Sequence, residues 1–222
     1  MRIMPKNKPH ERKKEYDMCA KEIPNAVMKR LPVYLHYLRS LHADEKTTIS
    51  SSSIAKALKL GEVQVRKDLA IVSGAGKPKI GYFVSELISH IESVLGSGKI
   101  THAVIVGAGK LGKALLCYDG FPEFGIDICA AFDKDAEKCG KFADNKDILP
   151  MSDMTAFCKE HDVKIGIITV PESQAQSVCD ALVQAGVAGI WNFAPASLTA
   201  PESVKIKDEN LASSLAVLTA CL

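Results

Sequence analysis

Residues 100–116 read ITHAVIVGAGKLGKALL, and this stretch decides how the second half of the chain folds. A β-branched apolar run that enters G-x-G-x-x-G and continues with Ala and Leu at helical spacing predicts a strand, a tight turn and a helix. In such a turn Gly107 permits the bend, Gly109 permits close approach of a pyrophosphate, and Gly112 permits close packing of the helix on the strand. The exposed N–H groups at the start of the helix favour phosphate. The stretch therefore predicts a dinucleotide-binding loop, whose other members are Ala108, Lys110 and Leu111.

An acidic residue follows at the distance that such a fold requires. Residues 126–132 (IDICAAF) predict a second strand, which delivers Asp133 21 residues after Gly112. A carboxylate about 20 residues after the last glycine binds the 2′-hydroxyl of a ribose. A purely structural glycine turn remains the alternative, but it would not require this acid. Because a carboxylate repels a 2′-phosphate, Asp133 favours NAD(H) over NADP(H), and we include the adjacent Lys134 in the predicted cofactor site.

The bulk composition limits the class of protein. With 222 residues, 47% of them hydrophobic, the chain can bury a core, and we expect two domains. No apolar run approaches the roughly 20 residues that span a bilayer, and the polar N-terminus lacks a signal-peptide core, so we expect a cytoplasmic protein without a membrane segment. Seven cysteines occur without a C-x-x-C pair. This spacing favours reduced thiols over disulfides, and we expect no metal site.

The net charge of +2 hides an asymmetry between the two halves. Residues 1–100 carry 18 Lys and Arg against 10 Asp and Glu, whereas residues 101–222 carry 10 against 16. A basic first half joined to an acidic second half is typical of a nucleic-acid-binding module attached to a ligand-binding domain. A solvated lysine-rich face would give the same count.

The first half predicts a flexible basic arm and then a helix-turn-helix. Residues 1–22 are charged and poor in apolar residues, and residues 24–41 show the apolar spacing of an amphipathic helix that Pro32 must begin or bend. Serines 50–53 offer an N-cap for a short helix that closes at residues 60–61. Residues 62–72 predict a third helix with one apolar face. Its inward residues would be Val65, Leu69 and Val72, its outward residues Gln64, Lys67 and Asp68, and its flank Arg66.

A wing and a linker helix complete the first domain. Residues 73–84 are rich in Gly and Pro and predict a β-hairpin, with Lys77 and Lys79 placed for contact with DNA phosphate or the minor groove; an ordinary exposed hairpin is the alternative. Residues 85–95 predict an amphipathic helix, and the glycines of 96–98 mark a boundary. We therefore expect an arm over 1–22, a winged-helix domain over 23–95 and a Rossmann-like domain over 96–222.

The second half alternates strands and helices. Strands are expected at 163–170, 189–193 and 204–206, and helices at 152–161, 172–185 and 210–221. This alternation predicts an α/β fold with a doubly wound parallel sheet, in which ligands sit beyond the carboxyl ends of the strands. Plain strand-ending turns are the alternative at those ends, but the residues there are candidates to flank a nicotinamide: Thr169, Val170, Pro171, Asn192 and Phe193.

Over residues 24–222 the chain resembles the Rex family of redox-sensing transcriptional repressors, which join a winged helix to a Rossmann-like domain. The motifs that carry the resemblance are RLPVYL (30–35), VRKDL (65–69), GY (81–82), VGAGKLGKAL (106–115), AFD (131–133), VP (170–171) with AQ (175–176), and NFAP (192–195).

The resemblance implies a repressor that senses the NADH/NAD⁺ ratio and is not an enzyme. It implies a homodimer in which the C-terminal helix is exchanged onto the partner, and in which bound NADH closes the dimer so that its recognition helices no longer fit successive major grooves. The operator would be a near-palindrome, because half-site symmetry mirrors protein symmetry. The residues expected at the DNA are Ser51, Ser52, Gln64, Arg66 and Lys67, with Lys77 and Lys79 on the wing.

Some positions depart from the family pattern. Residues 71–73 (IVS) and 78–79 (PK) replace family residues around the wing, which predicts an altered operator preference. A family arginine aligns with His36 and a family aspartate with Asn210, whereas Tyr118 of the same switch network remains. We hypothesise that losing this charge pair weakens or rewires the coupling between NADH and DNA.

Two alternatives remain at this point. A small NAD-dependent dehydrogenase would need a substrate domain, but the winged helix consumes about 95 residues, and only His102 and Tyr118 stand near as acid–base candidates. A winged-helix regulator that senses coenzyme A or ATP is the other alternative, because Asp133 indicates a free ribose diol but not the far end of the ligand.

Overall fold

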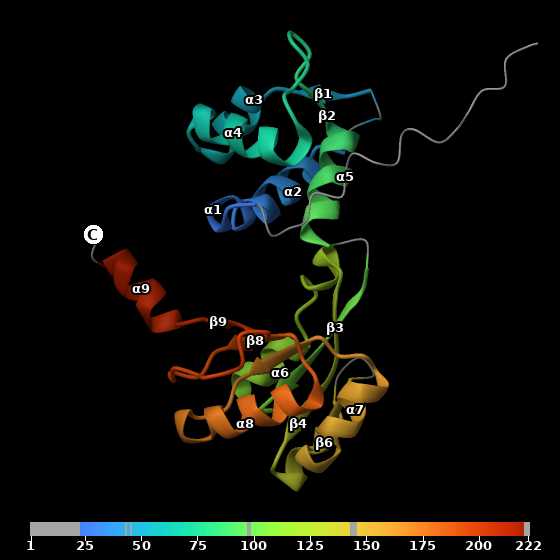
Figure 1. The fold of residues 1–222 in the computed structure, drawn as a ribbon, viewed down its shortest axis with the longest axis vertical. Coiled ribbons are helices and arrows are strands. Elements are labelled where there is room, and N and C mark those ends of the chain that lie inside the picture. Colours follow the sequence, from blue (N-terminus) through green and yellow to red (C-terminus); the bar gives the residue numbers. More distant parts are fainter. Residues whose placement is uncertain (1–22, 43, 45, 97–98, 143–145, 220–222) are drawn as a thin grey trace, which may run out of the picture. The chain divides into compact units, whose positions relative to one another are not determined.

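The computed structural model divides the chain into two compact units, Met1–Gly98 and Lys99–Leu222, and each is described by itself (Figure 1). The structure describes residues 23–42, 44, 46–96, 99–142 and 146–219. The arm predicted over 1–22 lies outside the described residues. No helix within these ranges combines the length and the apolar character needed to cross a membrane.

The first unit consists of helices around a two-stranded sheet. Its elements are α1 (Asn25–Met28), α2 (Leu31–Ser40), β1 (Thr48–Ile49), α3 (Ser51–Leu58), α4 (Glu62–Ser73), β2 (Tyr82–Phe83) and α5 (Val84–Leu95). The single helix expected over 24–41 is two helices, and Pro32 lies in the first turn of α2, where its missing N–H costs nothing. The Ser50 hydroxyl accepts a hydrogen bond from the Ser53 N–H at 3.0 Å, which confirms the predicted N-cap of α3.

The core of the first unit lies between α2, α4 and α5. Leu31, Leu35 and Leu38 of α2 are completely buried, as are Leu69 of α4 and Ile91 of α5. These residues recur every three or four positions, so each helix turns one apolar stripe inward. The predicted inward face of α4 is confirmed, since Val65 and Val72 are buried as well.

Asp68 was expected on the outward face of α4, and this prediction is wrong. The residue is 3% exposed, and its carboxylate accepts hydrogen bonds from Arg30 Nε at 2.7 Å and Nη2 at 2.8 Å. The Tyr34 hydroxyl donates to the same carboxylate at 2.7 Å. An acid on the inward side is tolerated because a bidentate guanidinium and a hydroxyl satisfy it. This pair fixes α4 against α2.

The hairpin predicted over residues 73–84 is present only at its tip, and the strand after the tip pairs elsewhere. Strand β2 pairs with β1, Thr48 opposite Phe83 and Ile49 opposite Tyr82, and the segment before β2 forms only a bridge between Lys77 and Gly81. The Lys77 N–H donates to the Gly81 carbonyl at 2.8 Å and the Gly81 N–H donates back at 2.8 Å, which closes a tight turn with Lys79 at its tip. The wing is therefore a short turn, closed by two reciprocal hydrogen bonds, that leads into the strand paired with β1.

The second unit is built on one seven-stranded sheet. Its strands are β3 (Thr101–Val106), β4 (Ile126–Asp133), β5 (Gly140–Lys141), β6 (Asp147–Pro150), β7 (Ile165–Ile168), β8 (Gly189–Asn192) and β9 (Lys205–Asp208). Their order is β5-β6-β4-β3-β7-β8-β9, and every pair except β5–β6 is parallel. Counted along the chain, the six parallel strands follow the order 3-2-1-4-5-6 of dinucleotide-binding folds. The predicted doubly wound parallel sheet is confirmed.

Helices cover both faces of this sheet (Figure 1). Helices α7 (Met154–Glu160) and α8 (Glu172–Ala185) pack on one face against Val104 and Phe132, whereas α6 (Lys110–Leu116) packs on the other against Ala103 and Ile105. Short 3₁₀ turns occupy Pro122–Phe124, Ala136–Lys138 and Met151–Asp153.

The last described helix, α9 (Leu211–Thr219), presents exposed apolar side chains. Leu211, Leu215, Val217 and Leu218 are each 57–67% exposed. A helix with this much exposed apolar surface is typical of an element that packs against another chain.

Candidate functional site

A cleft of about 580 Å³ opens beyond the carboxyl ends of β3, β4 and β7. This is the place where open parallel sheets bind ligands, because the strand order reverses between β3 and β7. The residues that line the cleft are Val106, Gly107, Gly109, Phe132, Asp133, Lys134, Lys138, Met151, Thr169, Val170, Pro171, Gln174, Ser177 and Val178.

Each of the three loop positions needs glycine for a different physical reason. Gly107 has φ +106°, and a Cβ there would lie 2.9 Å from the Thr169 backbone. A Cβ on Gly112 would lie 1.9 Å from the Gly107 carbonyl oxygen, so only glycine lets α6 approach the loop. A Cβ on Gly109 would meet nothing within 4 Å. Gly109 therefore keeps the mouth of the cleft clear for a ligand instead of relieving a clash within the protein.

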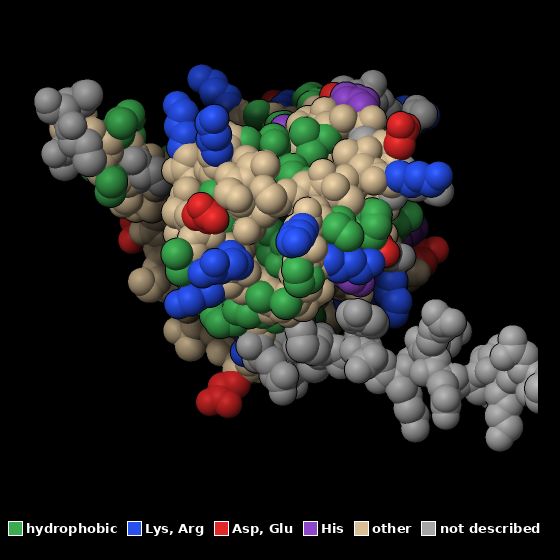
Figure 2. Space-filling model, turned by 90° about the horizontal axis from the view of Figure 1, so that it is seen from above, with side chains coloured by type: hydrophobic (Ala, Val, Ile, Leu, Met, Phe, Trp, Pro, Cys, Tyr) green, Lys and Arg blue, Asp and Glu red, His purple; other side chains and the backbone are tan. Residues whose placement is uncertain are grey.

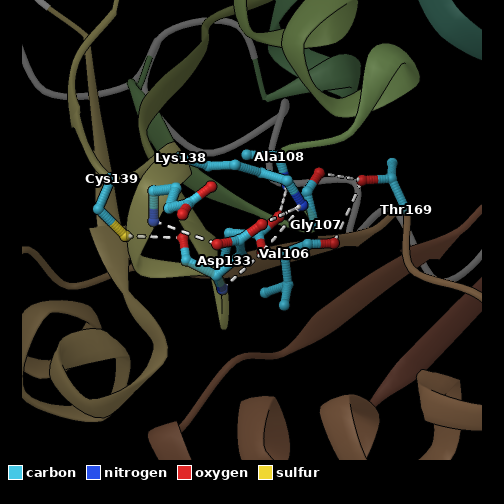
Figure 3. Close-up of polar contacts among 9 residues, drawn as sticks. Val106, Gly107, Ala108, Asp133, Lys138, Cys139 and Thr169 are labelled. Carbon is cyan, nitrogen blue, oxygen red and sulfur yellow. Dashed lines mark hydrogen bonds and ion pairs between the residues drawn. The ribbon is translucent and has the colours of Figure 1, made fainter.

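Thr169, at the end of β7, holds the loop in this shape (Figure 3). Its hydroxyl donates to the Gly107 carbonyl at 2.7 Å and approaches the Val106 carbonyl at 3.2 Å. A carbonyl engaged in this way cannot turn toward the cleft, so negative oxygen atoms stay away from the place where phosphates would bind. The glycine turn and Thr169, which were both predicted at the cofactor site, thus form one hydrogen-bonded unit.

Asp133 is the buried acid of the cleft, only 7% exposed. Its carboxylate accepts hydrogen bonds from the Ala108 N–H at 2.8 Å and from the Asp135 N–H at 2.9 Å, and Lys138 Nζ lies 3.2 Å away (Figure 3). Burial acts to raise its pKa, but the two N–H groups and Lys138 together outweigh burial and lower the pKa of Asp133. The side chain is therefore ionised at neutral pH, and it joins the glycine loop to the end of β4.

Lys138 lines the cleft, although no sequence pattern predicts it there. Its ammonium contacts Asp133 and also lies 3.6 Å from Asp135, which raises its pKa, with the hydrogen bond to Asp133 as the largest cause. The lysine lies five residues after Asp133 in a 3₁₀ turn, a spacing that belongs to no general motif. The other lining residues that the sequence analysis did not name as ligand contacts are Val106, Phe132, Met151, Gln174, Ser177 and Val178.

The structure brings most, but not all, of the predicted cofactor residues to this cleft. Gly107, Gly109, Asp133, Lys134, Thr169, Val170 and Pro171 line it. Ala108 is buried and acts through its N–H, and Lys110 and Leu111 form the first turn of α6 without lining the cleft.

Asn192 and Phe193 lie elsewhere. Asn192 is completely buried, and its amide donates to the Ala196 carbonyl at 2.9 Å and to Asp208 at 2.8 Å while its oxygen accepts from the Ala194 N–H. Phe193 packs against Trp191, with ring centroids 4.5 Å apart. The side chain of Asn192 therefore ties β8 to β9, and the structure does not bring it to the cleft.

The three predicted switch residues occupy different places. Tyr118 is 60% exposed and stacks edge-on against Phe121. Asn210 and Phe193 line a second hollow of about 520 Å³ at the start of α9. The Asn210 side-chain oxygen accepts from the Ser213 N–H at 2.9 Å, which caps α9. His36 lies exposed on α2, in the first unit.

The predicted DNA-contacting residues are on the surface of the first unit. Gln64, Arg66 and Lys67 are exposed on α4, Lys77 and Lys79 are exposed on the wing, Ser52 is exposed and Ser51 half-buried at the start of α3. Seen from the side of the wing, α3 and β1, Lys and Arg side chains outnumber acidic ones (Figure 2). With its amide oxygen turned toward Arg30, Gln64 also accepts from Nε at 3.0 Å and Nη1 at 3.1 Å.

Comparison with known proteins gives matches in both units. A family model described as "Putative DNA-binding protein N-terminus" matches residues 22–70, and one described as "CoA binding domain" matches residues 98–196. The redox-sensing transcriptional repressor Rex of Treponema denticola is 44% identical over 202 residues, which cover 90% of this chain and 96% of that protein. The Rex repressor of Carboxydothermus hydrogenoformans is 43% identical over 198 residues, covering 89% and 95%.

Solved structures agree with these sequence matches. The crystal structure of RSP in complex with β-NAD⁺ and operator DNA matches with a TM-score of 0.83 and 31% identity, over 90% of this chain and 92% of that chain. RSP in complex with β-NADH matches with a TM-score of 0.79 and 30% identity, over 90% and 94%. RSP is described as a Rex-family repressor.

Proposed function

Because this chain belongs to the Rex family of redox-sensing transcriptional repressors, we propose that it binds operator DNA as a homodimer and releases it when NADH fills the cleft. The single observation that carries the proposal is the pairing, in one cleft, of an ionised buried Asp133 with a loop that is open at Gly109. A dinucleotide needs both, a carboxylate for its ribose and unobstructed backbone N–H groups for its pyrophosphate.

The described residues fit NAD(H) on physical grounds. The open side of Gly109 admits a pyrophosphate, and the Thr169 bond keeps the Gly107 carbonyl turned away from it. Asp133 would accept from ribose hydroxyls and repel a 2′-phosphate, while Lys134 and Lys138 add positive charge along the same wall. Bound NAD(H) supplies a nicotinamide ring whose charge differs between its oxidised and reduced forms. Val170 and Pro171 offer that ring an apolar wall without an acid–base side chain, which supports binding rather than turnover.

We propose that the first unit binds the operator. Gln64, Arg66 and Lys67 would meet base edges and phosphates in the major groove, Ser51 and Ser52 would contact backbone phosphates, and Lys77 and Lys79 would contact the adjacent groove. Two such units related by a two-fold axis read a near-palindrome. Affinity should fall steeply with salt, because each neutralised phosphate releases counterions.

The second unit is proposed to make the dimer through α9. Its four exposed apolar side chains need an apolar surface to cover them, and an exchanged helix between two copies would provide it. Nucleotide binding would then be coupled to the conformation of the dimer through His36, Tyr118 and Asn210.

A mobility-shift assay on a palindromic operator, with NADH, NAD⁺, coenzyme A or ATP added singly, tests the proposal. The expected result is release by NADH alone. Release by coenzyme A or ATP instead would identify a regulator with a different ligand, although the 3′-phosphate of coenzyme A would be repelled by Asp133. Equal binding under all four additions would refute nucleotide sensing. Turnover of NADH with carbonyl substrates would indicate a dehydrogenase.

A further inference from the structure

A second cluster of reactive side chains lies at the opposite end of the β3–β4 pair from the nucleotide cleft. His102 is the second residue of β3, and Asp127 is the second residue of β4 and its register partner. Cys129 follows on the same strand. The cleft lies at the carboxyl ends of these strands, whereas this cluster lies at their amino ends, so it is separate from the proposed nucleotide site.

A β-bulge creates the cluster. The register pairs Ala103 with Ile128 and Val104 with Ala130, so Cys129 is the extra residue that has no partner on β3. Ile128 and Ala130 therefore belong to opposite faces of the sheet, although they are two residues apart. Bulges of this kind re-aim a side chain and are frequent next to functional sites. Here the bulge directs the thiol toward the imidazole.

Three donor atoms of different chemistry meet there. His102 Nδ1 lies 3.2 Å from Cys129 Sγ and 3.4 Å from Asp127 Oδ2, and Sγ lies 3.6 Å from the same oxygen. Tetrahedral zinc, with bonds of about 2.0 Å to nitrogen and oxygen and about 2.3 Å to sulfur, separates its ligand atoms by about 3.3 to 3.6 Å. The observed separations of 3.2, 3.4 and 3.6 Å are thus close to those of a metal-ligand set, with the nitrogen–sulfur distance slightly short.

We propose that His102, Asp127 and Cys129 bind one divalent ion of the zinc class. The mixed nitrogen, oxygen and sulfur donors select Zn²⁺ or Co²⁺ over Mg²⁺ or Ca²⁺, which take oxygen ligands. The three side chains are part-exposed, which leaves the fourth position to water. The sequence predicts no metal site because its cysteines are not paired in a C-x-x-C spacing. In the structure, one cysteine instead meets a histidine on the neighbouring strand.

Lys146 competes with the ion. Its ammonium lies 3.6 Å from Asp127 Oδ1 and is held by the Ile128 carbonyl at 2.5 Å. Cys129 also has a cost, since burial and the Asp127 carboxylate raise the pKa of its thiol to about 11, and the ion must displace that proton. Both features lower the affinity without changing the donor geometry.

Titration of the full chain with Co²⁺ in chelator-treated buffer tests the site. The expected result is one equivalent bound, with a thiolate-to-cobalt charge-transfer band, abolished by Zn²⁺ and by Cys129→Ser. His102→Gln should weaken binding at least about tenfold, a loss that even outer-sphere ligand partners produce. Cys117→Ser removes an exposed thiol and should leave the band unchanged. Lys146→Met should tighten binding severalfold by freeing Asp127.

Each result bears on the assignment. Absence of a stoichiometric band in the wild-type chain, or its persistence in Cys129→Ser, would overturn the site. Unchanged affinity in Lys146→Met would remove Asp127 from the ligand set and overturn the three-ligand assignment. Trp191 fluorescence of each variant without metal reports whether the second unit is folded, so His102→Gln remains informative if Cys129→Ser is not folded.

Discussion

The buried ion pair between Arg30 and Asp68 should be a major part of the stability of the first unit. Asp68→Asn removes the charge that two guanidinium N–H groups and the Tyr34 hydroxyl contact. Breaking a buried pair from one side costs about 3–5 kcal/mol. The Arg30 side chain is 24% exposed, so water recovers part of the loss and we expect about 3 kcal/mol. For a domain whose total stability is about 5–15 kcal/mol, this is a large fraction.

Urea unfolding of the full chain measures this effect unit by unit. The only tryptophan, Trp191, lies in the second unit, so its fluorescence follows that unit alone, while far-UV ellipticity follows both. With an m value of about 1.5 kcal/mol/M, a loss of 3 kcal/mol moves the midpoint of the first unit down by about 2 M. The transition seen by Trp191 should not move.

A matched variant separates burial from charge. Glu92 pairs with Arg39 at 2.8 Å in the same unit, but both side chains are about one-third exposed. Glu92→Gln should therefore cost only about 0–1 kcal/mol. Tyr34→Phe deletes one hydrogen bond and should cost about 1 kcal/mol. If Asp68→Asn costs no more than Glu92→Gln, the reasoning from burial is wrong.

Three further predictions concern the second unit and the switch. Because the pKa of Asp133 is lowered in the folded state, the stabilisation by its carboxylate is complete above the unfolded pKa of about 3.9 and is lost as pH falls through the folded pKa. Acid unfolding followed by Trp191 fluorescence should show this loss, and Asp133→Asn should abolish this part of the pH dependence. Gly112→Ala puts a Cβ 1.9 Å from a loop carbonyl oxygen and should lower the urea midpoint of the second unit. The Cβ added by Gly109→Ala meets no protein atom within 4 Å, so this variant should keep the urea midpoint but lose NADH affinity about tenfold or more, measured by NADH fluorescence. The double variant His36→Arg, Asn210→Asp introduces the two charges of the family pattern and should raise the ratio of operator affinities without and with NADH. A coupling of about 1.4 kcal/mol would raise this ratio about tenfold, and an unchanged ratio in mobility shifts would contradict the charge-pair hypothesis.

The parts of the site that sequence reasoning could predict are those whose chemistry is local. The glycine loop is specified within six residues, because turn geometry, phosphate access and helix packing each require glycine at a fixed offset. The position of Asp133 could be predicted because one helix and one strand of ordinary length separate it from the loop. The apolar stripes of α2 and α4 follow from helical periodicity, which also depends only on neighbours.

The parts that it could not predict depend on partners distant in the chain. Asp68 was expected in solvent because helical spacing alone puts it beside polar neighbours, and its partner Arg30 lies 38 residues away. The pairing of β2 with β1 depends on a two-residue strand, and so short a segment leaves no periodic pattern to detect.

The bulge at Cys129 could not be predicted for the same reason, and it has a larger consequence for the side chains around it. A strand read as strictly alternating places Ile128 and Ala130 on one face, whereas the extra residue puts them on opposite faces of the sheet. Nothing in the strand's own composition marks this shift, because the residues on both sides are apolar. The thiol's neighbour His102 belongs to a strand that begins 25 residues earlier in the chain. Donor sets assembled across strands therefore escape motif searches based on spacing, even when three-dimensional distances between their atoms fit a metal ion closely.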